Sequence, residues 1–157
     1  MSQGMDQERF AQVLLYLLEE TFESHHGIYL DKGTSLFETL GTISAAEASQ
    51  PVGGQCATLA AQVAHITFYL DVLERYMLGQ ETGEVDWGEI WQTIGEVTPD
   101  EWASLKAQLE QTYGRVSGRM RGFETWDDDK RMGGALGIVV HTAYHLGEIR
   151  QALCTLQ

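Results

Sequence analysis

Four long segments of this chain repeat apolar residues at helical spacing, and no segment alternates apolar and polar residues as a half-buried strand would. The predicted helices run from Asp6 to about Glu23, from about Gln55 to about Met77, from Thr98 through Met120, and from about Lys130 to Leu153. Because each helix carries an apolar face, the four faces are expected to be buried against one another. The sequence therefore predicts an all-α fold, a four-helix bundle whose strongly apolar last helix is central.

Short helices are expected in the connections between the long ones. Ser35 to Glu38 and Ser44 to Glu47 each match the capping-box pattern, which predicts two short helices. The polar segment from Glu81 to Val97 carries Trp87 and Trp91, and this pattern predicts one short helix that docks its indoles on the bundle. A length of 157 residues fits one core, so the whole chain is expected to be a single domain.

Composition argues against several classes of function. The formal net charge is −13 and the ten Lys and Arg residues form no dense stripe, so nucleic-acid binding is not expected. No leader-like segment opens the chain, and no segment has the roughly 20 apolar residues of a membrane span, so a membrane partner is not expected either. The two cysteines, Cys56 and Cys154, lie far apart, which favours a reducing compartment and predicts a cytoplasmic protein.

The last predicted helix carries a possible metal-binding pair, His141 and His145. Residues four apart on a helix lie on one face, one turn apart, so both imidazoles can reach a single ion. Several small residues and one carboxylate project within about 40° of His141, and we expect the small ones to leave a hollow beside the histidines. These residues are Gly134, Gly137, Glu148 and Ala152.

His65, at the edge of the apolar stripe of the second long helix, is the candidate for a third ligand. Three protein ligands leave a coordination position open for water or substrate, which is typical of catalytic metal sites. Imidazoles suit Zn or Ni best here, with Fe or Cu also possible, and helical spacing places Cys56 and Cys154 on faces opposite to His65 and His145. The alternative is that the three histidines are hydrogen-bonding residues of a metal-free core.

His25 and His26 are adjacent and are expected in the last turn of the first helix. Neighbouring residues on a helix point about 100° apart, so these two do not form a ligand pair by themselves. Favourable contact with the negative end of the helix is the simpler interpretation.

The chain resembles the DinB-like, or YfiT-like, metalloenzymes, whose last helix carries a His-x-x-x-His-x-Gly-Gln-Ile motif. The corresponding residues here are His141-Thr142-Ala143-Tyr144-His145-Leu146-Gly147-Glu148-Ile149, and His65 matches the single histidine of the family's second helix. Glu148 departs from the family's usual Gln. This carboxylate is expected first to orient an imidazole; a fourth metal ligand or a neutral surface change are the alternatives.

The resemblance implies a four-helix bundle with one divalent metal ion held by His65, His141 and His145, and often a homodimer. Some relatives transfer or isomerise substrates with small thiols such as mycothiol or bacillithiol. We therefore expect a metal-dependent hydrolase or thiol transferase acting on a small molecule. Tyr69, Tyr144 and Trp91 are expected to line its pocket, and Glu148 is a candidate base, but spacing alone identifies no catalytic residue. The competing hypothesis is a non-catalytic stress-response module that works through a dimeric surface.

Overall fold

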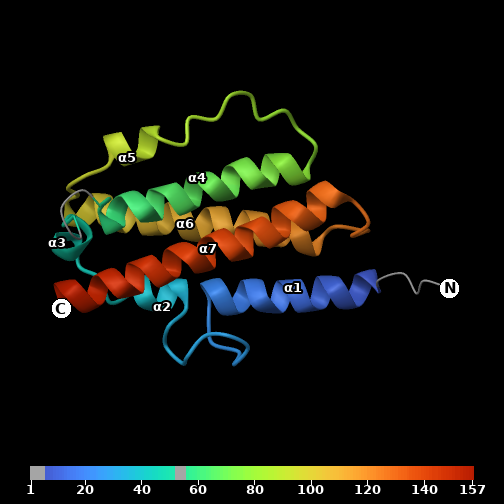
Figure 1. The fold of residues 1–157 in the computed structure, drawn as a ribbon, viewed down its shortest axis with the longest axis horizontal. Helices are drawn as coiled ribbons and strands as arrows, with labels where there is room; N and C mark the ends of the chain where they lie inside the picture. The colour runs from blue at the N-terminus through green and yellow to red at the C-terminus, as the bar shows by residue number, and fades with distance from the viewer. Residues whose placement is uncertain (1–5, 52–55) are drawn as a thin grey trace.

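Residues 6–51 and 56–157 are described by a computed structural model of the chain, and within these ranges all helices and no strands are found (Figure 1). This confirms the predicted all-α class. The long helices are α1 (Gln7–Phe22), α4 (Leu59–Met77), α6 (Pro99–Arg121) and α7 (Asp129–Leu156). The short helices are α2 (Leu36–Leu40), α3 (Ala45–Ala48) and α5 (Glu89–Thr93), which confirms the three that the sequence predicted in the connections.

The four long helices lie side by side, and the core fills the space between them (Figure 1). Helix α4 packs most closely against α7 and α6, while α1 packs on α7 and α6 from the other side. The largest fully buried side chains come from all four helices and from α2: Leu14, Leu18, Phe22, Leu36, Leu59, Ile66, Leu70, Leu109, Met120, Ile138, Leu146 and Ile149. The pairing of α4 with α7 is the contact that brings the predicted metal ligands together.

Helix α4 begins at Leu59, where the side chain of Thr58 caps it by accepting a hydrogen bond from the backbone of Ala61. The predicted start, Gln55, lies outside the described residues. Because α4 begins at Leu59, Cys56 lies before the helix. The helical spacing that placed Cys56 on the face opposite to His65 therefore does not apply to it. Cys56 nevertheless does not belong to the group formed by the three histidines, as the sequence predicted.

Helix α7 is only partly enclosed, contrary to the expectation that it would be central. Leu136, Val140 and Tyr144, spaced four residues apart, are 44%, 67% and 63% exposed. The helix packs against α4 on one side and α1 on another, so the remaining stripe faces outward. In the described ranges, no helix is both long enough and apolar enough to cross a membrane.

The indoles of the 81–97 connection dock on α4, as predicted. Trp91, on α5, lies against the imidazole of His65 with ring centroids 4.4 Å apart. Trp87 packs against Phe68 and Tyr69, with centroid distances of 5.8 and 5.4 Å. This connection therefore covers the part of α4 that carries His65.

The predicted hollow beside the histidines is present only in part: Ala152 and Glu148 line an open pocket beside His145, whereas Gly134 and Gly137 leave no space. A Cβ added to Gly134 would lie 2.4 Å from Cγ of Met77 and 3.3 Å from the Tyr76 ring, and one added to Gly137 would lie 3.1 Å from Leu73. Side chains of α4 thus occupy the space above both glycines. The glycines allow α4 and α7 to approach closely, which is a packing role.

Replacing Gly134 with Ala is expected to lower the free energy of unfolding by about 1–3 kcal/mol, because Met77 has to move or strain to admit the new methyl group. Gly133→Ala is the matched control: its Cβ would meet nothing within 4 Å, and Ala at an exposed helix position should stabilise by about 0.5–1 kcal/mol. Urea unfolding of both variants measures the difference. Equal stabilisation by the two substitutions would contradict the close approach of α4 and α7.

Candidate metal centre

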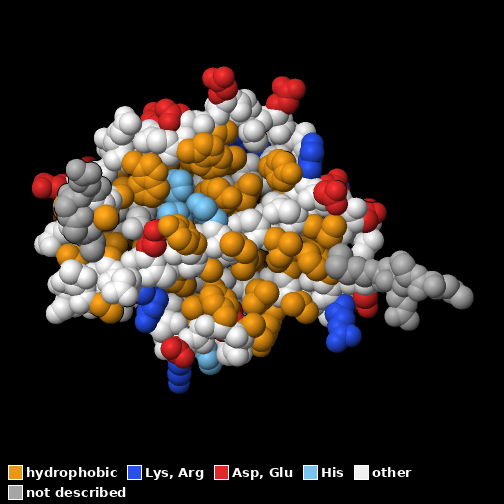
Figure 2. Space-filling model, viewed as in Figure 1, with side chains coloured by type: hydrophobic (Ala, Val, Ile, Leu, Met, Phe, Trp, Pro, Cys, Tyr) orange, Lys and Arg blue, Asp and Glu red, His pale blue; other side chains and the backbone are white. Residues whose placement is uncertain are grey.

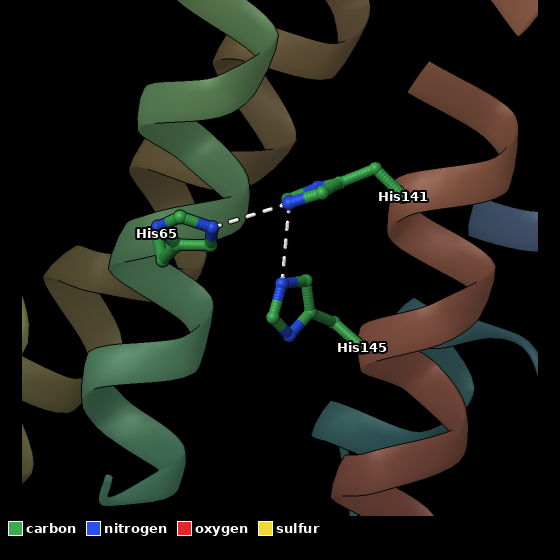
Figure 3. A group of neighbouring side chains, drawn as sticks. All are labelled: His65, His141 and His145. Carbon is green, nitrogen blue, oxygen red and sulfur yellow. Dashed lines mark hydrogen bonds between the residues drawn. The ribbon is translucent and has the colours of Figure 1, made fainter. Parts of the chain in front are cut away.

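The three predicted ligands meet between α4 and α7. His65 projects from α4, while His141 and His145 project from successive turns of α7, and the three rings converge in one place (Figure 3). One ligand atom from each of the three lies within 4.8 Å of the others, and the described residues contain no other His, Cys, Asp or Glu group of this kind. The cluster could therefore hold one metal ion.

The Nε2 atoms of the three rings face one another. His141 Nε2 lies 3.1 Å from His65 Nε2 and 3.2 Å from His145 Nε2. Two nitrogens bound at 2.0–2.1 Å to a tetrahedral ion are separated by about 3.3 Å, so both distances are close to those of a shared ion.

Hydrogen bonds among the three neutral imidazoles cannot satisfy all three Nε2 atoms. Each ring nitrogen of a neutral imidazole carries either one N–H or one lone pair, so His141 Nε2 can make only one good hydrogen bond although it has two close neighbours. A cation that accepts a lone pair from each Nε2 would satisfy all three nitrogens. The donor set fits a divalent ion for this reason, and imidazole is a good ligand for Zn, Ni and Fe.

Burial keeps the three imidazoles in their neutral, ligating form. His65 and His145 are 6% and 5% exposed. Burial and the repulsion between neighbouring histidines lower the pKa of His65 to about 4 and that of His141 to about 3. Burial also lowers the pKa of His145, against the opposing effect of Glu148. At neutral pH the lone pairs are therefore free to bind a cation.

Glu148 is the one acidic side chain in direct contact with the cluster. Its Oε2 lies 2.9 Å from Nδ1 of His145, although the orientation falls short of a well-directed hydrogen bond. The Nδ1 atoms of His65 and His141 are buried and have no hydrogen-bond partner among the described residues. The contact supports the interpretation that Glu148 orients His145, because a carboxylate on the far nitrogen fixes the tautomer that leaves Nε2 free for metal.

Aromatic rings enclose the other two histidines. Tyr69 stacks on His141 with centroids 3.5 Å apart and planes 10° apart, and Trp91 covers His65. Trp91 and Tyr144 line a pocket as predicted, whereas Tyr69 is used in stacking on His141 and does not line it. These contacts hold the rings in fixed orientations, as a preformed metal site requires.

An open pocket of about 850 Å³ reaches the cluster beside His145. Its walls include Trp91, Tyr144 and Glu148 together with two residues that sequence reasoning missed, Cys56 and Gln62. Helical spacing could not find Cys56, because it lies in the irregular segment before α4. The pocket gives a small molecule access to one edge of the candidate metal centre.

His25 and His26 lie away from this cluster and belong to no metal-binding group in the described part of the chain. Helix α1 ends at Phe22, so neither histidine is in its last turn, and that expectation was wrong. The ring of His26 instead packs edge-on against Tyr16 at 4.0 Å.

Comparison with known proteins identifies no relative: the chain matches no family model, no curated protein and no solved structure. These comparisons therefore assign the chain to no family, and the resemblance to the DinB-like proteins stays an expectation from the sequence.

The stability of the metal-free protein is expected to fall as the pH is lowered from about 7.5 to about 5.5. An unfolded histidine takes up its proton near pH 6.5, whereas His65 and His141 in the folded protein do so only near 4 and 3. The unfolded state therefore binds more protons in this interval, which costs the folded state about 1 kcal/mol for each of the two residues at pH 5.5.

Urea unfolding at the two pH values, with a chelator present, measures this loss. The His25→Asn control should retain the full pH dependence, because the side chain of His25 is exposed and outside the cluster. His141→Asn should reduce the dependence by about 1 kcal/mol. An unchanged slope in His141→Asn would mean that this imidazole titrates normally in the folded protein.

Proposed function

We propose that this chain binds one divalent metal ion through His65, His141 and His145 and uses it as a metal-dependent hydrolase or thiol transferase of the DinB/YfiT-like four-helix-bundle type. The observation that carries the proposal is the convergence of the three Nε2 atoms at 3.1 and 3.2 Å, which hydrogen bonding among neutral imidazoles cannot fully satisfy. The all-imidazole donor set favours Zn or Ni, with Fe as the next candidate.

Three protein ligands leave room for an exogenous one, so a bound divalent ion would act as a Lewis acid and lower the pKa of a water or thiol. Side chains around the cluster hold the three imidazoles in position for this chemistry. His65 and His141 are held by the rings of Trp91 and Tyr69, and Glu148 contacts Nδ1 of His145. The open pocket beside His145 admits a small-molecule substrate, for which a low-molecular-weight thiol is one candidate.

A second candidate function is a non-catalytic stress-response module that acts as a homodimer. The exposed apolar side chains of Leu136 and Val140 on α7 favour it, because chains that each carry a net charge of −13 can approach one another most easily through an uncharged surface. We propose a homodimer under either candidate. The free cysteines Cys56 and Cys154 are consistent with the proposed cytoplasmic location.

Turnover distinguishes the two candidates. Chelated wild-type protein reloaded with Zn or Ni is expected to hydrolyse activated esters or to transfer a small thiol to an electrophile, and the chelated protein is expected to be inactive. The His145→Ala variant should stay inactive after reloading, while a His25→Ala control should recover, because His25 lies outside the cluster. A folded dimer without turnover on either substrate class would favour the interaction module. Turnover that persists in His145→Ala would overturn the proposed site.

A further inference from the structure

The pocket beside His145 has an unusual combination of walls. It runs along the last part of α7, from Tyr144 to Thr155, which spans about 16 Å at 1.5 Å per residue. Of the described residues that line it, only Glu148 is charged, and none is Lys or Arg. A negatively charged ligand would therefore find no basic side chain here and would meet both this carboxylate and the acidic chain as a whole.

Two aromatic rings of the pocket wall lie close to His145. The ring centroids of Trp91 and Tyr144 lie 6.2 and 5.2 Å from that of His145, and Trp91 and Tyr144 are 37% and 63% exposed. Figure 2 shows pale-blue histidine side chains at the surface among hydrophobic ones. The carboxylate of Glu148 lies beside His145, with Oε2 2.9 Å from Nδ1 of the imidazole.

We propose that Trp91, Tyr144 and Glu148 form a subsite for an organic ammonium group, so that the substrate of this site is an amine whose reactive end reaches the histidine cluster. Aromatic rings attract a cation through their negative faces, and an adjacent carboxylate adds charge attraction. Glu148 follows His145 by three residues, about 4.5 Å along the helix axis, so an ammonium group at Glu148 lies one turn from the candidate metal centre.

Binding of the ammonium group needs only the pocket walls, whereas its role as part of a substrate rests on the proposed metal-dependent function. The test is therefore done first on chelated protein, where metal binding plays no part. It is then repeated after reloading with Zn, which shows whether the subsite persists beside the occupied centre.

The probes are choline and dimethylbutanol, its uncharged carbon isostere, with binding followed by ligand-observed NMR. Choline is expected to bind about tenfold more tightly than the alcohol and to weaken as salt is added. Trp91→Leu should abolish this preference. Trp87→Leu is the matched control, since Trp87 belongs to the same connection and is similarly exposed, at 42%, but does not line the pocket. Tyr144→Leu, at a largely exposed position that should not affect folding, should also reduce it.

Equal binding of the two probes, binding of neither, or a preference that survives Trp91→Leu would overturn the subsite. A choline preference in a protein that retains no metal would leave the subsite standing and remove only the proposed metal function. Conversely, metal binding without any choline preference would leave the metal centre standing and remove the amine assignment.

Discussion

Wild-type protein dialysed against a weak chelator is expected to retain about one divalent ion per chain, while the His141→Ala variant is expected to retain almost none. His141 is the most informative position because its Nε2 is the atom that contacts both other candidate ligands. Its removal leaves only two imidazoles, and losing a direct ligand should cost at least the roughly 100-fold in affinity that the loss of a supporting residue can cost. Elemental analysis of both proteins measures the result.

Metal binding should also raise the free energy of unfolding. At 100 to 1,000 times its dissociation constant, an ion that binds only the folded state adds about 3–4 kcal/mol to the free energy of unfolding. Added Zn or Ni should therefore raise the melting temperature of the wild type and leave that of His141→Ala unchanged. His25→Ala, which alters an exposed histidine outside the cluster, should behave as the wild type. Failure of the wild type to retain an ion or to gain stability from either metal would leave the three histidines as a structural cluster.

Glu20→Gln is expected to lower the free energy of unfolding by about 3 kcal/mol, although the substitution keeps the size of the side chain. Glu20 is on α1, is fully buried, and accepts hydrogen bonds from five successive backbone N–H groups after that helix. These donors belong to His26, Gly27, Ile28, Tyr29 and Leu30, at distances of 2.9 to 3.4 Å. An amide in its place would turn an NH₂ group toward some of these donors and would lose the charge that strengthens the bonds.

The contribution of Glu20 to the free energy of unfolding should change with pH in one direction. Burial alone would raise the pKa of Glu20, but the backbone donors of Leu30, Ile28, His26 and Tyr29 outweigh it and hold this pKa below its usual 4.5. Glu20 therefore stabilises the folded protein at pH values above the ordinary carboxyl range, and this contribution is lost as the pH falls through its lowered pKa. Glu20→Gln should accordingly cost most near neutral pH and progressively less in acid.

Glu19→Gln is the matched control for this prediction, measured by urea unfolding at pH 7. Glu19 is the preceding residue, and its carboxylate forms a surface ion pair with Arg121 at 2.8 Å. Exposed pairs contribute about 0–1 kcal/mol, so this variant should remain close to the wild type. If Glu20→Gln were no more damaging than Glu19→Gln, the buried carboxylate would not be what organises the 26–30 segment.

Local signals explain why so much of the fold could be predicted. Helices α1, α4, α6 and α7 all have apolar residues at helical spacing, and α6 begins with the capping box of Thr98 and Glu101 that the sequence shows. The sequence-based prediction failed for residues whose role is decided by a contact with a distant segment of the chain. Gly134 and Gly137 looked like the floor of a hollow, but Met77 and Leu73 of α4 fill that space.

The candidate site divides in the same way. The pairing of His141 with His145 follows from the helical repeat, which places residues four apart on one face whatever surrounds the helix. The sequence by itself also determined the helical class, the caps and the docking of the indoles on the bundle, because these depend on neighbouring residues or on strong apolar character.

Only the tertiary structure decided that His65 meets the other two histidines, because that contact requires α4 and α7 to pack in one particular rotation and register. It also placed Cys56 on the wall of a pocket that residues of α7 line as well. Each of these contacts joins segments whose relative position is set by how the whole core packs, and no local repeat in a sequence encodes such a position.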